Sequence, residues 1–330
     1  METSQGHGGK LHYLRRTHAP VARIHERMRR LIPLLFLIVS VRVSADVCRM
    51  SAPDLAFVES AKKTWDAVRA HALRLPRAPM PQLVFFDETC VWRDGAGSRH
   101  RGAIIVPGGD EIPARVVSFA GSDQGRAFLV MALPAVWRKE ARHRDNPRLA
   151  LLMRCVFVHE MTHTRQADAF TKRLDEIEAQ YEIEIDDDIV QTRFAERDGF
   201  RSAYQAERDL LFAIGRDGDR EVAKAAVRMA RDRRARQFID DDAIYAELEE
   251  IFLGMEGVAN WAAMRAAMHE GLAPADATAF IRRDGRRWSQ DEGLALFLAI
   301  DALLPQWQTR VFGANPAPVW SLLEEAGGIR

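Results

Sequence analysis

The chain has 330 residues, of which 47% are hydrophobic and 28% are charged, and these proportions exclude a wholly disordered or fibrous protein. Its 47 basic residues balance its 47 acidic residues, and a net charge of zero argues against a general nucleic-acid-binding protein. Three cysteines are too few for a disulfide scaffold or an all-cysteine zinc site.

Residues 1–45 have the composition of a secretory signal peptide. They hold eight basic and two acidic residues, which leaves 39 basic and 45 acidic residues after them, a net charge of −6. An apolar run from Leu31 to Val41 is followed by Val43-Ser44-Ala45, small residues that suit a cleavage site. The run is shorter than the about 20 residues that span a bilayer. We expect an exported protein, periplasmic or secreted, with no membrane span after cleavage; an uncleaved anchor and a buried core helix are the alternatives.

Two further features of the N-terminal part depend on this prediction. If Met28 is the true start, Met28 to Ala45 makes a signal peptide of ordinary length. Export also permits disulfides, so Cys48 and Cys90 can pair. Cys155 lies in an apolar helical run and is predicted to be a buried thiol.

A helix and a small sheet are predicted to follow the signal peptide. Apolar residues recur at helical spacing over residues 52–75, until three prolines at positions 76, 79 and 81 end the pattern. Short β-prone runs separated by turn residues come next. They are Leu83–Phe86, Ala103–Val106, Val116–Ala120 and Ala127–Ala132. We expect an antiparallel or mixed sheet.

The remainder of the chain is predicted to be mostly helical. Asn146 suits the position before a helix and Pro147 its first residue, so a long helix is expected to start there. Further helical segments are expected near residues 196–215, 219–238, 242–268 and 290–303. Two charged runs, Asp186 to Asp188 and the arginines between Arg231 and Arg236, are interpreted as solvated. The predicted fold class is α+β and predominantly helical.

Residues His159-Glu160-Met161-Thr162-His163 fit the pattern His-Glu-x-x-His within the predicted helix. Residues four apart lie on one helix face, so both imidazoles can reach one metal ion. Glu160 lies beside the first ligand, where it can accept a proton from a water molecule that the metal activates. This spacing predicts a zinc site with His159 and His163 as ligands and Glu160 as the general base.

A catalytic zinc site needs a third protein ligand. No third histidine follows in the spacing of the longer three-histidine motif, so a glutamate on a later helix is expected. Glu256 lies in a stretch that is apolar except for itself and Asn260, and a buried carboxylate needs a partner such as a cation. Asn260 can hydrogen-bond a ligating imidazole, and Gly257 can allow the helices to approach closely.

Other glutamates remain open as the third ligand. Glu207 is the main rival, although its charged neighbours also suit a solvated position. Glu292 shares the Glu-Gly-x-Ala pattern of Glu256, but a capping box over residues 289–292 accounts for it structurally. Tyr245 is a candidate for stabilising the oxyanion of the transition state, and packing is the alternative for it.

The motif at His159 to His163, followed by Met-Glu-Gly-Val-Ala-Asn-Trp at residues 255–261, resembles the gluzincin metallopeptidases of the peptidase MA type. The resemblance covers about a tenth of the mature chain. It implies zinc bound by His159, His163 and Glu256, with Glu160 as base and acid. It also implies that Ala127–Ala132 is an edge strand that pairs with a peptide substrate.

These observations predict an exported zinc-dependent peptidase that acts on peptides or proteins. Residues 46–330 would form one zincin-like catalytic domain, with the sheet and active-site helix in 46–170 and the third ligand in 171–330. The alternative is a catalytically inactive zincin-like protein of the cell envelope that binds a metal or a partner. Oligomeric state and substrate specificity do not follow from the sequence.

Overall fold

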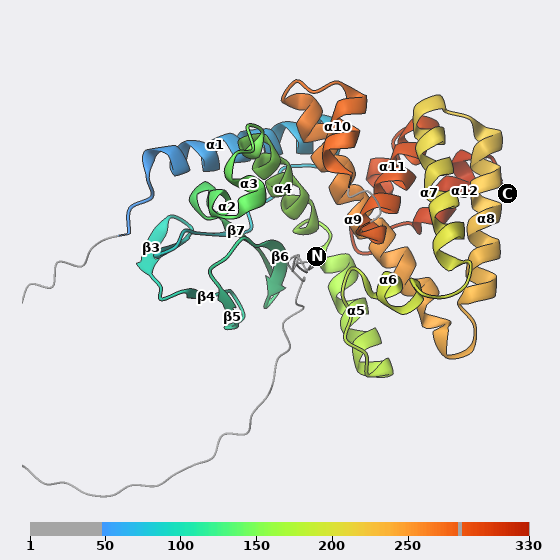
Figure 1. The fold of residues 1–330 in the computed structure, drawn as a ribbon, viewed down its shortest axis with the longest axis horizontal. Helices are drawn as coiled ribbons and strands as arrows, with labels where there is room; N and C mark the ends of the chain where they lie inside the picture. The colour runs from blue at the N-terminus through green and yellow to red at the C-terminus, as the bar shows by residue number, and fades with distance from the viewer. Residues whose placement is uncertain (1–47, 283–285, 330) are drawn as a thin grey trace, which may run out of the picture.

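A small mixed sheet and a larger group of helices lie side by side in the protein (Figure 1). The computed structural model describes residues 48–282 and 286–329. The predicted signal peptide at 1–45 therefore lies outside the described residues. The α+β class, the small sheet and the predominance of helix in the C-terminal part are confirmed.

The main sheet has five strands in the order β3-β2-β1-β7-β6. Their bounds are Gln82–Phe86 for β1, Cys90–Arg93 for β2, Ala96–Arg99 for β3, Ser118–Asp123 for β6 and Arg126–Ala132 for β7. β1 and β7 pair in parallel at the centre, and the other pairs are antiparallel. Both central strands are continuous apolar runs, as expected where both faces of a strand are covered. β4 (Ala103–Ile105) and β5 (Glu111–Pro113) form a separate pair.

Two features of the sheet differ from the prediction. The expectation that Ala127–Ala132 is the edge strand is wrong, because β7 lies between β1 and β6, and the edge strands are β3 and β6. β2 and β3 were not predicted, since β3 has no apolar alternation and β2 is only four residues long. Asp94 and Gly95 join them with positive φ at both residues, the geometry of a tight hairpin turn.

A disulfide joins Cys48 to Cys90, so the predicted pairing is confirmed. It links the segment before the first helix to β2, and the indole Nε1 of Trp92 donates to the Cys48 carbonyl oxygen at 3.0 Å. Cys155 is a buried free thiol, as predicted. Burial raises the pKa of the Cys155 thiol to about 12, so it stays protonated and unreactive.

The helix with the His-Glu-x-x-His motif, α4 (Leu149–His163), lies at the centre of the fold, where it contacts α1, the sheet and α9. α1 (Ala52–Ala67) continues into a π-helical turn, Val68–Ala72, which ends before the prolines as predicted. α4 begins later than predicted. The Asn146 side chain accepts a hydrogen bond from the Arg148 N–H at 2.9 Å, a local turn that delays the first helical residue.

Helices make up the rest of the chain. They are α2 (Pro134–Lys139), α3 (Ala141–Arg144), α5 (Ala167–Tyr181), α6 (Ile189–Phe194), α7 (Phe200–Asp217), α8 (Arg220–Gln237), α9 (Ile244–His269), α10 (Pro274–Ile281), α11 (Trp288–Leu303) and α12 (Val319–Ala326), with short 3-10 turns at Asp240–Asp242 and Trp307–Arg310. α9 contacts α1, α4, α10, α11 and α12, and its middle is buried on all sides and largely apolar, as expected of a central helix. The element that carries Glu256 is therefore held rigidly against the motif helix.

The close crossing of α9 and α11 depends on two glycines. A Cβ added at Gly257 would lie 2.6 Å from the backbone oxygen of Gly293 and 2.6 Å from a ring carbon of Phe297. Gly257 thus allows a close helix approach, but the prediction that it does so between α9 and the motif helix is wrong, because its close neighbour is α11. This contact fixes the backbone next to Glu256.

Replacing Gly257 with alanine is expected to lower the free energy of unfolding by about 1–3 kcal/mol, because the methyl group overpacks this crossing. Chemical denaturation of the variant and wild type measures the difference. Gly254→Ala on the same helix is the control, since its added Cβ would meet no backbone atom and only two side chains, a Val319 methyl group at 3.3 Å and a Phe170 ring carbon at 3.9 Å. Equal stability of Gly257→Ala and wild type would contradict the prediction.

A buried ionic cluster lies between α7, α8, α9 and α11. Arg233 is 1% exposed, and its guanidinium donates to both oxygens of Glu207, at 2.9 and 3.0 Å, and to Glu249 at 2.6 Å. The predicted solvated role is therefore wrong for Arg233 and for Glu207. Glu292 is also buried here rather than in a capping box, because α11 begins at Trp288, without a side-chain cap.

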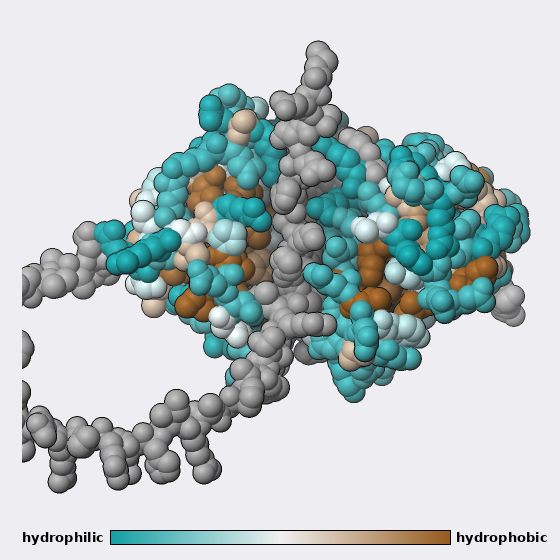
Figure 2. All heavy atoms as spheres, turned by 60° about the horizontal axis from the view of Figure 1, so that its bottom comes forward, coloured by the Kyte–Doolittle hydropathy of each residue, from teal (hydrophilic) through white to brown (hydrophobic). Residues whose placement is uncertain are grey.

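On the face shown in Figure 2, hydrophilic residues predominate, and apolar residues are visible among them in both halves. The large apolar side chains that are most exposed lie apart on different elements. They are Leu55, Met80, Ile105, Tyr181 and Ile239. Within 48–282 and 286–329, no helix has an apolar stretch of the length that crosses a membrane.

Candidate metal centre

The two motif histidines project from the last turns of α4 onto the same side. Their Nε2 atoms are 2.9 Å apart, and the ring planes are nearly perpendicular. The His159 side chain is 12% exposed and that of His163 is 6% exposed. The spacing of four residues therefore produces the predicted convergence of the two imidazoles.

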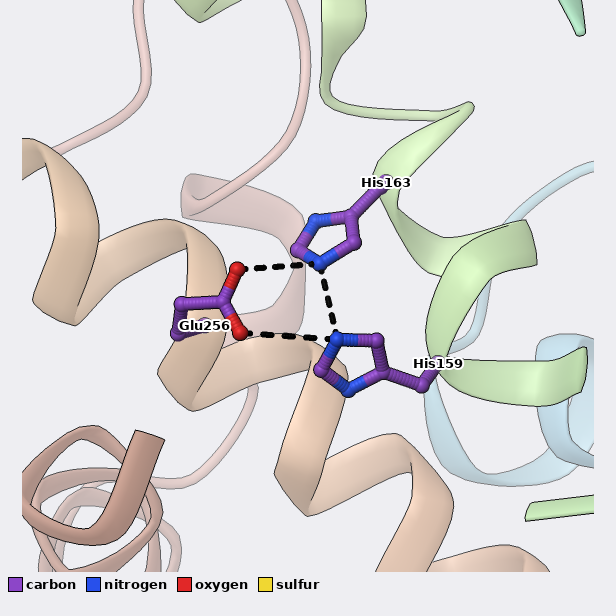
Figure 3. Close-up of side chains that lie close together, drawn as sticks. All are labelled: His159, His163 and Glu256. Atoms are coloured by element: carbon purple, nitrogen blue, oxygen red, sulfur yellow. Dashed lines mark hydrogen bonds and ion pairs between the residues drawn. The ribbon is translucent and has the colours of Figure 1, made fainter. Parts of the chain in front are cut away.

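Glu256 faces this pair from α9 (Figure 3). Its carboxylate oxygens lie 3.2 Å from Nε2 of His163 and 3.4 Å from Nε2 of His159. One possible ligand atom from each of the three residues lies within 4.8 Å of the other two. No other such group of three occurs among the described residues. The prediction placed these three side chains together, and the structure brings them together.

The chemistry of the three groups suits a cation. Glu256 is fully buried, and its oxygens accept no well-formed hydrogen bond from any described residue. Nδ1 of His163 lies 3.0 Å from the side-chain oxygen of Gln166, so Nδ1 carries the proton of the neutral ring, and the Nε2 lone pair of that form faces the carboxylate. Lone pairs and a negative charge that converge in a buried site need either protons or a metal ion. The buried group can thus hold a metal ion.

Protons hold this site together when no metal is bound. Burial alone would lower the pKa of His163, but the adjacent Glu256 carboxylate raises it to about 9. Burial would raise the pKa of Glu256, but the positive charge of His163 holds it well below its ordinary value. At neutral pH the metal-free pair is therefore an imidazolium and a carboxylate.

Metal binding is expected to strengthen as pH rises towards 9, because the metal displaces a proton from His163. The affinity should rise up to about tenfold per pH unit below this pKa. Calorimetric titration with zinc at pH 7 in buffers of different ionisation enthalpy should show about one proton released per ion. Identical apparent enthalpies in all buffers would contradict this prediction. By linkage, the metal-free protein loses the stabilisation from His163 as pH rises from about 6.5 to about 9.

Glu160 follows the first histidine and is 6% exposed. One of its carboxylate oxygens is buried and makes no hydrogen bond to a described residue. The negative charge of Glu160 contributes to the raised pKa of His163, so Glu160 lies near the metal ligands. Glu160 is not one of the three residues that form the candidate metal site. Glu160 therefore has a free oxygen for a proton beside the site.

Three other predicted site residues lie elsewhere or act differently. Asn260 donates to the backbone oxygen of Glu256 at 2.9 Å, one turn back on its own helix, rather than to an imidazole. Glu207 is not a metal ligand, because Arg233 occupies both of its oxygens. Tyr245 packs edge-on against Phe194, and the eleven residues to Glu256 span about 16 Å of helix, so it cannot contact the site.

Two residues near the site escaped the sequence prediction. Gln166 is buried at the end of the motif turn and contacts His163. Asp187 was interpreted as solvated, which is wrong: it is buried, and burial together with the negative charge of Glu256 raises its pKa to about 7. The spacing of Gln166, three residues after His163, was a usable signal, whereas Asp187 was hidden in a run of three aspartates.

We compared the chain with family models, with curated proteins and with solved structures, and none of them matches it.

Proposed function

We propose that the protein is an exported zinc-dependent peptidase. The observation that carries this proposal is the buried group of His159, His163 and Glu256, with Glu160 beside it. Two imidazoles and one carboxylate are a ligand set that zinc accepts, with a fourth position left for water or substrate. When bound, zinc lowers the pKa of water towards neutrality and polarises a carbonyl group.

Glu160 supplies the proton transfer. Its unpartnered oxygen accepts a proton from the attacking water and then delivers it to the amine that leaves. His163 cannot take this role, since both of its ring nitrogens are engaged, one by Gln166 and the other at the site. A single carboxylate therefore acts first as base and then as acid.

The sheet edge provides a place for an extended substrate. β6 is one of the two edge strands; it pairs with β7 on one side only, and it contacts the motif helix α4. An extended peptide can add to such an edge through backbone hydrogen bonds, which requires no particular sequence. We therefore assign the pairing with a substrate to Ser118–Asp123 instead of Ala127–Ala132. An edge strand that can pair in this way favours a peptide or protein substrate.

Export is supported by the disulfide between Cys48 and Cys90, because such bonds persist in oxidising compartments. Residues 1–45 also favour export, because they combine a basic segment, an apolar run and small residues that suit a cleavage site. The net charge of −6 that follows position 45 favours a substrate other than nucleic acid.

Zinc analysis of the purified protein tests the metal site. We expect one zinc per chain in wild type and a zinc affinity lowered more than about 100-fold in Glu256→Ala. This loss exceeds the effect of removing a residue that only hydrogen-bonds a metal ligand. Glu196→Ala is the control, since the Glu196 side chain is 93% exposed. Unchanged zinc affinity in Glu256→Ala would remove this residue from the site.

Peptide cleavage tests the activity. Wild-type protein should cleave members of a peptide library, and a chelator should abolish cleavage until zinc is restored. Stoichiometric zinc without any cleavage would favour the alternative, a catalytically inactive metal- or partner-binding protein of the cell envelope.

A further inference from the structure

Gln166 lies where α4 ends and α5 begins, and its side chain is almost completely enclosed. The backbone N–H of Gln166 donates to the carbonyl oxygen of His163 at 2.9 Å, which closes a tight turn after the motif. The residue is 1% exposed. Its amide must therefore find partners inside the protein.

Both ends of the amide have partners, and they come from different helices. The side-chain oxygen accepts from Nδ1 of His163 at 3.0 Å, and the side-chain nitrogen donates to the backbone oxygen of Met255 at 3.4 Å. A backbone carbonyl can only accept, so the Met255 contact fixes which end of the amide is nitrogen. The oxygen is then left for His163, which must donate from Nδ1.

This arrangement decides the form of the imidazole. With its proton on Nδ1, neutral His163 keeps a lone pair on Nε2, the atom that lies 3.2 Å from Glu256. The opposite tautomer would direct an N–H at the position of the ion. It would also place two lone pairs, on Nδ1 and on the amide oxygen, against each other.

The hydrogen bond from Gln166 to Met255 also affects the position of Glu256, the third ligand. Met255 directly precedes Glu256, so the same amide ties the ring of His163 to the backbone of α9 next to the carboxylate. His163 and Glu256 are 93 residues apart in the chain, and Gln166 links their two helices at the point where their side chains converge.

We propose that Gln166 is a positioning residue for the metal site, which sets the tautomer of His163 and the distance between His163 and Glu256. This inference rests on the proposed metal-binding function. It predicts that the ion is held by three ligands whose geometry depends on a fourth, non-ligating side chain. Mutation of a residue that hydrogen-bonds a metal ligand without binding the metal typically lowers metal affinity by about 10–100-fold.

The first test measures zinc affinity by chelator competition and site geometry by the visible spectrum of the cobalt(II) form. Gln166→Leu removes both hydrogen bonds, and we expect zinc binding at least about tenfold weaker, with an altered cobalt spectrum. Gln166→Glu keeps an acceptor for Nδ1 but cannot donate to Met255 when ionised, so its affinity should lie between those of wild type and Gln166→Leu. Gln308→Leu replaces another buried glutamine, 5% exposed, and should match wild type.

The outcomes separate this inference from the function on which it rests. Zinc binding by wild type together with unchanged affinity and cobalt spectrum in Gln166→Leu would overturn the role of Gln166 and leave the metal site standing. Absence of zinc binding by wild type would overturn both.

A second test needs no variant and applies even if Gln166→Leu does not fold. In the zinc-loaded wild-type protein, nitrogen-15 NMR should detect the His163 ring proton on Nδ1, protected from exchange by Gln166. A ring proton on Nε2, or an Nδ1 proton that exchanges as fast as in a free imidazole, would overturn the proposal.

Discussion

Replacing Glu160 with glutamine is expected to abolish turnover while the protein keeps one zinc ion. The side chain is not one of the three that converge on the ion, so ligation does not require its charge. A neutral amide cannot accept the proton of the attacking water, and positioned acid–base groups typically contribute about 10²–10⁴-fold to rate. Peptide cleavage should therefore fall at least about 100-fold, and zinc content should not change.

The control for this variant is Glu196→Gln, which makes the same chemical change at an exposed site. Both proteins should unfold at the same temperature as wild type and hold the same amount of zinc. If Glu160→Gln cleaves peptides as fast as wild type, the proposed base is wrong. If it also loses zinc, Glu160 supports the metal site itself rather than only the proton transfer.

Replacing Arg233 with methionine is expected to produce the largest loss of stability. Its guanidinium is 1% exposed and neutralises Glu207 and Glu249, while Glu292 lies in the same cluster. Burial and the charge of Glu207 raise the pKa of Glu292 well above its ordinary value, so this carboxyl stays protonated. Removal of the cation would leave two buried carboxylates uncompensated, at a cost of about 3–5 kcal/mol.

Chemical denaturation measures this loss, with Arg236→Met as the control because Arg236 lies on the exposed side of α8. The triple variant Arg233→Met, Glu207→Gln, Glu249→Gln should recover much of the stability, since it removes the charges together with their partner. A loss below about 1 kcal/mol in the single variant would show that the carboxylates take up protons without strain or are reached by water.

The positions of the site residues were predictable where the local pattern carried the chemistry. Spacing alone placed His159 and His163 on one face, and a lone carboxylate in an apolar stretch identified Glu256 as buried. Judging burial from sequence neighbours failed for Glu207, because its charged neighbours suggested a solvent-exposed position. Its partner is Arg233, 26 residues later, and no local pattern reveals a pair formed between two helices.

Other parts of the fold depended on contacts that sequence spacing does not encode. The chain contains five other strands between β1 and β7, which pair in parallel, so the order of the sheet and its edge strands could not be predicted from turn residues. A usable signal was missed at Asp94-Gly95, a dipeptide typical of hairpin turns, which would have indicated β2 and β3. Gln166 was also missed, although its position three residues after His163 was a usable signal, because an isolated glutamine does not suggest a metal site by itself.

The disulfide at the far side of the sheet has a consequence for the metal site. It closes a loop of 42 residues that contains all of α1 and β1, and α1 packs against the motif helix from behind. In the chain-entropy treatment, breaking such a loop costs about 4 kcal/mol. Reductants would thus lower the free energy of unfolding of the fold that holds α4, and a reduced preparation would lose its metal under milder denaturing conditions than an oxidised one. Protein produced in a reducing cytosol should be reoxidised before any assay of metal content.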